Sequence, residues 1–200
     1  MKQRIVMLLD VTGSMGAIRE NTIKAFNEYV NGLKKDSPKK TTFSLILFSS
    51  LCFDTLVDNV KVANIPELTK ETYRPNGSTP LLDSVGKAVR QTENSLKEKE
   101  DILLVVFTDG EENSSMEFSK SAVADLVKRK TDEGWTFVFM GANMDAWNEG
   151  ESMAVPKGNI QDWESQNVAI AFSSLSVGTK RHLYRTGGQS ASSNFWEEED

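Results

Sequence analysis

Two uninterrupted apolar runs in the sequence predict strands that are buried on both faces of a sheet. Residues 5–9 read Ile-Val-Met-Leu-Leu, and residues 102–107 read Ile-Leu-Leu-Val-Val-Phe. Central strands of a parallel sheet show such runs because helices cover both of their sides. Three further strands are predicted at 42–48, rich in β-branched and aromatic residues, at 52–62, whose mixed apolar and charged positions suit a sheet edge, and at 135–140.

Between these strands, apolar residues recur at steps of three and four positions, which indicates helices with one buried face. The first stripe comprises Ile18, Thr22, Ala25, Phe26, Tyr29, Val30 and Leu33. A second helix begins at Thr79-Pro80, where a hydroxyl suits the cap and proline suits the first turn. Its apolar face holds Leu82, Val85, Val89, Thr92 and Leu96. Segments 118–130, 145–153 and 165–175 are also expected to be helical.

The alternation of strands and helices predicts an α/β fold, with a doubly wound, mostly parallel sheet flanked by helices on both faces. The chain of 200 residues is long enough for one well-packed domain of this kind. From residue 186 the sequence becomes rich in Gly, Ser, Gln and Asn, and it ends in Phe-Trp-Glu-Glu-Glu-Asp. We therefore expect a domain at 1–186 and a flexible acidic C-terminal tail at 187–200.

Composition and charge argue against several classes of function, including nucleic-acid binding and membrane insertion. The formal net charge of −6 argues against nonspecific binding to a nucleic-acid backbone, which needs clustered Lys and Arg. The longest apolar runs are far shorter than the roughly 20 residues that a membrane span needs, and the first residues lack the pattern of a secretory signal. Cys52 is the single cysteine, so no internal disulfide is expected, and we interpret it as a buried small hydrophobe. These features predict a cytoplasmic protein that binds neither nucleic acid nor membrane.

The sequence lacks the residues that several common types of catalytic, metal-binding and nucleotide-binding site need. His182 is the only histidine and lies near Arg181 and Arg185 in a segment expected at the surface, which removes most zinc sites and any Ser-His-Asp hydrolase. Residues 13–16 lack the lysine and the spacing of a P-loop, and no dinucleotide-binding fingerprint is present. We expect the neighbouring acids Glu111 and Glu112 to lie in a solvated turn.

Three short segments carry oxygen-bearing side chains where strands end or helices begin. Residues 10–14 (Asp-Val-Thr-Gly-Ser) follow the first strand, 77–80 (Gly-Ser-Thr-Pro) open a helix, and 108–110 (Thr-Asp-Gly) follow the strand at 102–107. Loops at the carboxyl ends of strands converge at the switch point of a doubly wound sheet. If the two apolar strands are neighbours, Asp10 and Asp109 face each other there.

Two carboxylates and three hydroxyls in one crevice suit a hard divalent cation. Because only two of these five groups carry charge, the cation would stay electron-poor and open to an outside oxygen ligand. Taken one at a time, Ser14 or Thr79 could simply cap a helix, and Asp109 could belong to an ordinary turn. Their joint occurrence favours the metal site.

The three segments, in this order, resemble the metal-ion-dependent adhesion site of von Willebrand factor A domains. The resemblance covers about residues 1–185 and implies a Rossmann-like, six-stranded, mostly parallel sheet with one antiparallel edge strand near 52–62. It also implies Mg²⁺ or Mn²⁺ as the cofactor. The implied metal residues are Asp10, Thr12, Ser14, Thr79 and Asp109. The family usually has serine where Thr12 stands, but threonine keeps the hydroxyl. Segment 141–145 is similar to small stand-alone A-domain proteins of bacteria and phages.

The resulting hypothesis is a non-enzymatic, metal-dependent protein-interaction module whose partner presents an Asp or Glu to the cation. Nearby residues that could set specificity are Met15, Arg19, Asn76, Ser78, Asn113 and Ser114. One alternative is a magnesium-dependent enzyme of phosphoryl transfer or hydrolysis, although no pair of nucleophile and base is apparent. Another is a structural subunit of a larger assembly, in which the metal is only a stabilising clip. In the tail, Phe195-Trp196 and the acids after it could reach a neighbouring molecule's metal or could simply be solvated.

Overall fold

The predicted alternation of strands and helices is present in the computed structural model, which describes residues 1–142, 145–185 and 193–196. The strands are β1 (Lys2–Asp10), β2 (Thr41–Ser49), β3 (Cys52–Lys61), β4 (Glu100–Thr108), β5 (Thr136–Ala142) and β6 (Ile160–Trp163). The α-helices are α1 (Arg19–Asp36), α2 (Leu81–Ser95), α3 (Lys120–Asp132), α4 (Ala146–Ser152) and α5 (Val168–Tyr184). Short 3₁₀ helices are η1 (Gly13–Ile18), η2 (Val62–Asn64), η3 (Lys157–Asn159) and η4 (Ser165–Asn167).

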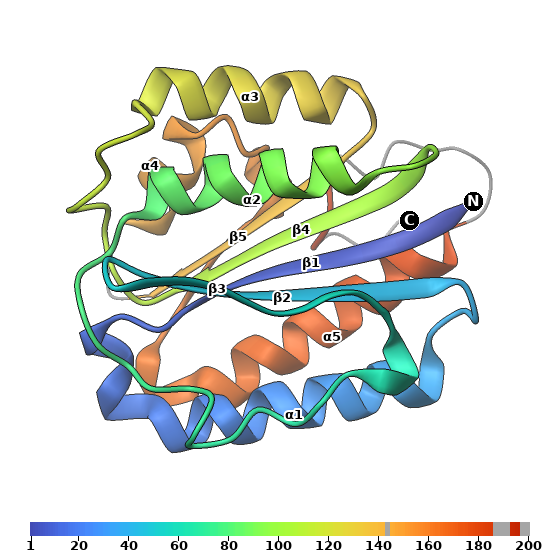
Figure 1. Ribbon diagram of the computed structural model, residues 1–200, viewed down its shortest axis with the longest axis horizontal. Coiled ribbons are helices and arrows are strands. Elements are labelled where there is room, and N and C mark those ends of the chain that lie inside the picture. Colours follow the sequence, from blue (N-terminus) through green and yellow to red (C-terminus); the bar gives the residue numbers. More distant parts are fainter. Residues whose placement is uncertain (143–144, 186–192, 197–200) are drawn as a thin grey trace.

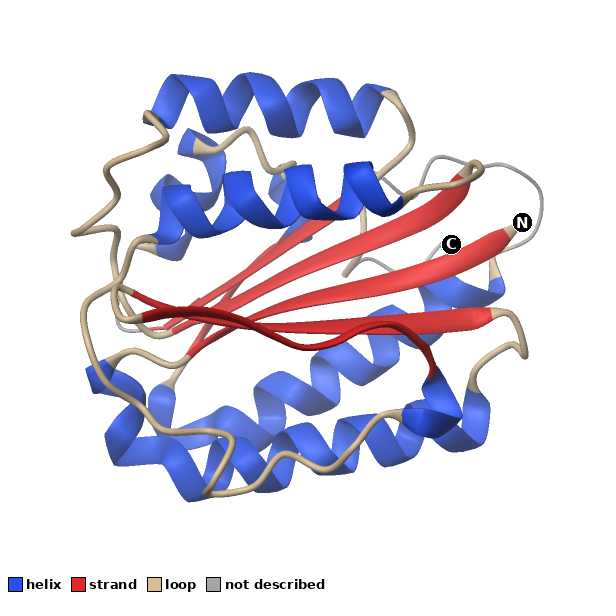
Figure 2. Cartoon of the chain, viewed as in Figure 1, coloured by secondary structure: helices blue, strands red, loops and turns tan. Residues whose placement is uncertain are grey.

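The strands form one six-stranded sheet in the order β3-β2-β1-β4-β5-β6. Every neighbouring pair is parallel except β2 and β3, which are antiparallel. Helices α1 and α5 cover one face of the sheet, and α2, α3 and α4 cover the other (Figures 1 and 2). The predicted doubly wound sheet, with an antiparallel edge strand near 52–62, is therefore confirmed.

The strand order brings the carboxyl ends of β1 and β4 side by side, at the left in Figure 1. We call this place the β1–β4 crevice, because a crevice forms at the corresponding place in open parallel sheets. From β1 the chain proceeds outward to β2 and β3, then crosses back to β4 on the opposite side of β1. This reversal is the switch point at which ligands bind in open parallel sheets. Leu9 pairs with Phe107, so Asp10 and Thr108 follow side by side at the ends of their strands.

The buried run in β1 faces two apolar layers in turn. Met7 and Leu9 belong to the layer beneath α1 and α5, whereas Val6 and Leu8 belong to the layer beneath α2 and α3. All four side chains have no exposed surface. Residues 5–9 have an apolar core on each side, which favours an apolar residue at every position and explains the unbroken pattern. No helix in the described part of the chain combines the length and apolar character of a bilayer span.

Two elements near the C-terminus differ from the prediction. Strand β6 is not predicted from the sequence pattern, because it has only four residues and two of them, Gln161 and Asp162, are polar. Helix α5 extends well beyond the expected end at 175. Its last turns bury His182, which is 3% exposed and lies 3.3 Å from the carboxylate of Asp101. The expected surface position of His182 is therefore wrong.

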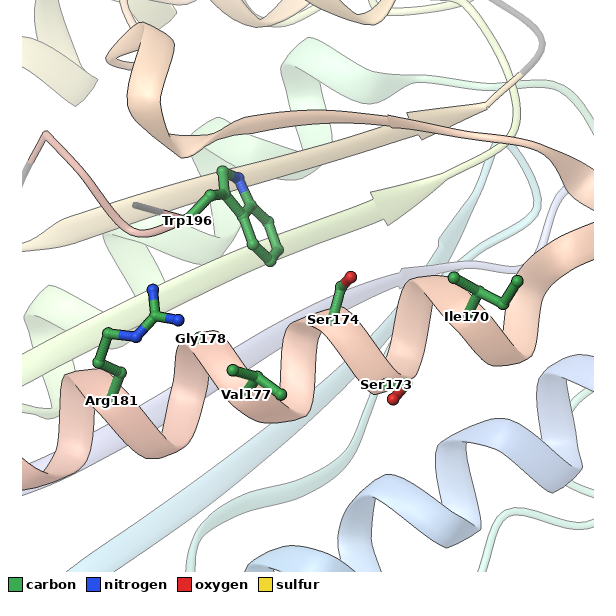
Figure 3. Close-up of a pocket in the computed structure, with 7 residues that line it drawn as sticks. All are labelled: Ile170, Ser173, Ser174, Val177, Gly178, Arg181 and Trp196. Carbon is green, nitrogen blue, oxygen red and sulfur yellow. The ribbon is translucent and has the colours of Figure 1, made fainter. Parts of the chain in front are cut away.

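Residues 193–196 lie against the domain, which differs from the flexible tail expected at 187–200. The ring of Phe195 is 1% exposed and sits directly over Gly178, where any Cβ atom would collide with it. Its backbone N–H donates to Asn159 Oδ1 at 2.8 Å, and the N–H of Trp196 donates to the carbonyl of Gly158 at 3.2 Å. Trp196 faces α5 across a groove (Figure 3). Residues 143–144, 186–192 and 197–200 lie outside the described residues.

Candidate metal centre

Asp10, the last residue of β1, is held in a fixed orientation at the base of the crevice. Its side chain has no exposed surface. One carboxylate oxygen accepts the backbone N–H of Thr12 at 2.6 Å, and the other accepts the hydroxyl of Thr108 at 2.5 Å. Because Thr108 ends the neighbouring strand β4, the pairing of β1 and β4 sets the direction of the Asp10 carboxylate.

A second set of contacts joins the loop after β1 to the loop after β4. The hydroxyl of Ser14 donates to Asp109 Oδ1 at 2.6 Å, and it lies 3.1 Å from the hydroxyl of Thr12. Thr12 and Asp109 are 1% and 6% exposed, whereas Ser14 lies at the surface. Oxygen atoms from the loops after β1 and β4 therefore lie together, and of these three residues Ser14 is the exposed one.

Thr79 completes the predicted set from the start of α2. Its residue is 3% exposed, and its hydroxyl lies against Gly110, where an added Cβ would come within 2.8 Å of Oγ1. The backbone N–H of Thr79 donates to Asn113 Oδ1 at 2.8 Å. Since Gly110 directly follows Asp109, Thr79 lies beside the loop that carries Asp109, and the five residues named from the sequence come together at the carboxyl ends of β1 and β4.

Backbone hydrogen bonds join the first and second ligand-bearing segments. The N–H of Gly13 donates to the carbonyl of Gly77 at 2.9 Å, and the N–H of Asn76 donates to the carbonyl of Val11 at 2.8 Å. Gly77 has a φ of +87°, a left-handed conformation that favours glycine. The position of Thr79 is thus coupled to that of Thr12 and Ser14 through main-chain contacts.

Tyr73 supports the crevice from below and was not identified from the sequence. Its side chain is fully buried, and its hydroxyl donates to the backbone carbonyl of Asp10 at 2.7 Å. Arg19 holds this loop in turn, because its guanidinium donates to the carbonyls of Tyr73 and Lys70. Tyr73 lies in an irregular segment with no periodic pattern, so only the folded structure shows its role.

Two carboxylates fasten the loop after Asp109 to the first turn of α2. Glu112 accepts hydrogen bonds from the backbone N–H groups of Leu82, Ser114 and Ser115 and from the Ser115 hydroxyl, at 2.6–2.9 Å. Asp83 accepts three more at 2.8–2.9 Å from the N–H groups of residues 116–118. The expected solvated turn is therefore wrong for Glu112, whereas Glu111 is exposed.

The electrostatics of the crevice favour a bound cation. Burial raises the pKa of Asp10 to about 6, and the nearby charge of Asp109 adds to the effect, while hydrogen bonds from Thr108 and Thr12 oppose it. Burial likewise raises the pKa of Asp109. Within the described residues, neither carboxylate forms an ion pair with Lys, Arg or His. Two adjacent buried carboxylates without a countercharge are costly, and a divalent cation would remove that cost.

The donor set fits a hard cation. In the described part of the chain, no group of three or more His, Cys, Asp or Glu side chains is placed to hold a metal ion, and the crevice itself has only two carboxylates. Hydroxyl oxygens supply the remaining ligands here, and oxygen-only sets are the type that Mg²⁺ and Mn²⁺ prefer. The crevice is therefore compatible with the cofactor expected from the sequence.

The residues expected to set specificity differ in how accessible they are to a partner. Met15 has no exposed surface, so its assignment to the binding rim is wrong. Asn113 faces the crevice but uses its Oδ1 atom to hold Thr79. Asn76 and Ser78 are exposed beside the crevice and remain available to a partner.

Comparisons with known proteins agree with this architecture. The family model described as von Willebrand factor type A domain matches residues 5–173. The vWF domain of the type V pili tip protein Mfa5 from Porphyromonas gingivalis is 12% identical with a TM-score of 0.67, and the match covers 93% of this chain and 97% of that one. Manganese-loaded TRAP protein from Plasmodium vivax is 16% identical with a TM-score of 0.60, covering 88% of this chain and 73% of that one.

A third solved structure is proximal thread matrix protein 1 from the mussel byssus, with a zinc-occupied MIDAS motif. It is 17% identical with a TM-score of 0.61, and the match covers 91% of this chain and 47% of that chain. The present chain thus spans just under half the length of the mussel protein. At these identities the likenesses establish the fold. None of the curated protein sequences matches the chain significantly.

Proposed function

Because the chain belongs to the von Willebrand factor type A domain family, we propose that it binds a protein partner through a divalent cation at the β1–β4 crevice. The residues proposed to hold the cation are Asp10, Thr12, Ser14, Thr79 and Asp109. The observation that carries this proposal is their convergence from three separate segments, with both carboxylates buried and lacking a basic partner among the described residues.

The charge balance of the five residues explains why a partner would be needed. Asp10 and Asp109 supply at most two negative charges, and the three hydroxyls supply none. When bound, a Mg²⁺ or Mn²⁺ ion supplies Lewis acidity and a coordination position for an outside oxygen. Ser14 lies at the open side of the crevice, so a carboxylate of a partner Asp or Glu would enter there.

The hydrogen bonds of the Ser14 and Thr108 hydroxyls favour a binding function over a catalytic one. Ser14 donates to Asp109 and Thr108 donates to Asp10, and both carboxylates are proposed to hold the cation. A carboxylate that holds a cation would be a poor base for activating either hydroxyl as a nucleophile. The single histidine, His182, lies against Asp101 at the opposite ends of the strands.

Metal titration tests the site directly. EDTA-stripped protein is titrated with Mg²⁺ and Mn²⁺ in a calorimeter, alongside Thr79→Val and its matched control Thr79→Ser. We expect one-to-one binding in the wild type and in Thr79→Ser, and a loss of at least about tenfold in Thr79→Val, which keeps the shape but lacks the hydroxyl. Glu111→Gln controls for general negative potential and is expected to bind as the wild type.

Partner binding forms the second half of the test. Proteins captured by the immobilised domain in Mg²⁺ should be released by EDTA, and they should not be captured by Asp109→Asn. Capture that persists in EDTA would refute the coordination mechanism. If Asp109→Asn unfolds the chain, as shown by circular dichroism, the metal would instead be a structural clip of a larger assembly.

A further inference from the structure

Leu51 places an exposed apolar side chain beside the proposed metal crevice. It lies in the two-residue turn Ser50–Leu51 between β2 and β3, at the same end of the sheet as the carboxyl end of β1. Leu51 is 67% exposed, so its isobutyl group is largely in contact with solvent. Exposed leucines are common in folded proteins, and exposure alone therefore carries no functional meaning.

The contacts of Leu51 connect it to the ligand-bearing segments. Its Cγ atom lies so close to Gly77 that a Cβ atom on that glycine would be only 3.1 Å away. The carbonyl of Gly77 accepts the N–H of Gly13, which separates Thr12 from Ser14. One residue, Gly77, thus contacts both the leucine and the loop that lines the crevice.

The turn is also held in place before any partner arrives. The N–H of Ser50 donates to the carbonyl of Ser78 at 2.9 Å, and the N–H of Ser78 donates back to the Ser50 hydroxyl at 2.9 Å. The N–H of Leu51 donates to the hydroxyl of Ser49 at 3.2 Å. A partner that contacts Leu51 would therefore pay little to order the turn, which is the usual advantage of a preorganised surface.

Two other exposed apolar side chains lie away from the ligand-bearing segments. Ile170 and Val177 lie on α5, where they line a groove of about 300 Å³ together with Trp196 (Figure 3). Helix α5 packs on α1, and its groove is built from α5 and the C-terminal segment. None of the proposed metal residues lines that groove. Val177 therefore serves as a matched control for Leu51.

Resting on the proposed metal-dependent function, we propose that Leu51 is a specificity-determining residue and that the partner's Asp or Glu is flanked by a large apolar residue. The acidic group would complete the metal site, while the apolar neighbour would pack on Leu51. A second acid in place of the apolar neighbour is disfavoured, because the aliphatic side chain of Leu51 offers a carboxylate no hydrogen-bond donor.

Short peptides test this inference with defined probes. Ac-Gly-Asp-Gly-NH₂ serves as the reference, and Ac-Leu-Asp-Gly-NH₂ and Ac-Gly-Asp-Leu-NH₂ place the apolar residue on either side. Binding to the full-length, Mn²⁺-loaded protein is measured from the paramagnetic relaxation of the peptide protons. We expect one leucine peptide to bind about fourfold or more tightly than the reference, which corresponds to burying about one methylene group.

The variants assign that preference to a residue. In Leu51→Ser the preference is expected to fall below about 1.5-fold, and in Val177→Ala it is expected to persist, since that side chain lies elsewhere. Equal binding of all three peptides, or a preference that survives in Leu51→Ser, would overturn the inference and leave the proposed function in place. If no peptide binds the Mn²⁺-loaded protein, the proposed carboxylate mechanism itself fails, and the inference fails with it.

Discussion

Gly110→Ala is expected to weaken metal binding while leaving the fold intact. The backbone of Gly110 is outside the left-handed region, since the positive-φ glycines among the described residues are Gly77 and Gly134. Alanine is therefore acceptable to the main chain. Its Cβ atom, however, would lie 2.8 Å from Thr79 Oγ1, too close for two unbonded atoms, while the other Thr79 atoms are at 3.7 Å. The hydroxyl must turn away from its present position.

The size of the effect follows from the loss of one oriented ligand among five. Disturbing a group that positions a metal ligand lowers affinity by about 10- to 100-fold, or roughly 1.4–2.7 kcal/mol. The metal-free protein should change little, because replacing glycine by alanine in an allowed conformation contributes about 0.4–1 kcal/mol through the unfolded chain. This gain offsets part of the strain caused by moving Thr79. The expected signature is a large change in metal affinity with a small change in the free energy of unfolding.

Calorimetric titration with Mg²⁺, combined with urea unfolding in EDTA, separates these two quantities. Gly16→Ala is the matched control, because its Cβ atom would meet only Pro75 at 3.9 Å, an ordinary contact near the same crevice. Its Mg²⁺ affinity should stay within about twofold of the wild type. If Gly110→Ala binds Mg²⁺ as tightly as Gly16→Ala does, the Thr79 hydroxyl is not a ligand and the reasoning is refuted.

Three further predictions concern the support of the crevice and the C-terminal segment. Tyr73→Phe removes the hydrogen bond to the Asp10 carbonyl. The free energy of unfolding, measured in urea, should fall by about 1 kcal/mol, and Mg²⁺ should bind more weakly. If neither the stability nor the Mg²⁺ affinity changes, Tyr73 does not support the site. The raised pKa of Asp10, about 6 against an ordinary 3.8, means that the native state holds more protons between these values. The metal-free protein should therefore lose about 2.4 kcal/mol of stability as pH rises from 4 to 7, and Asp10→Asn should lack most of this decline in urea titrations. Gly178→Ala should lower the free energy of unfolding by about 1–3 kcal/mol, because the new methyl group displaces Phe195. In a Phe195→Ala background the same substitution should lower it much less, and equal losses in this double-mutant cycle would contradict the contact.

The local sequence was sufficient to predict most of the fold and the candidate metal residues. Residues 5–9 and 102–107 predict central strands because burial on both faces favours apolar residues at successive positions of a strand. Asp10 and Asp109 could be selected because each follows such a strand, and parallel strands bring their carboxyl ends together. Thr79 could be selected because a hydroxyl before proline marks a helix start, which lies at the same edge of a doubly wound sheet.

Contacts between distant segments could not be predicted in the same way. His182 was expected at the surface because Arg181 precedes it, yet α5 continues past Leu175 and places His182 seven residues further along the same buried face. The role of Glu112 depends on how its loop meets α2, and that of Tyr73 depends on where an irregular segment crosses beneath β1.

The sequence by itself therefore determined the spacing of buried residues along each element, the alternation of strands and helices, and the carboxylate and hydroxyl groups present at the strand ends. Only the tertiary structure decided which loops touch, which side chains lose their water and where Phe195 and Leu51 lie. The physical reason is that periodic patterns record which face of an element is buried but not which element buries it. Hydrogen bonds such as Ser14 to Asp109, between residues 95 positions apart, arise only when the sheet has brought its strands into register.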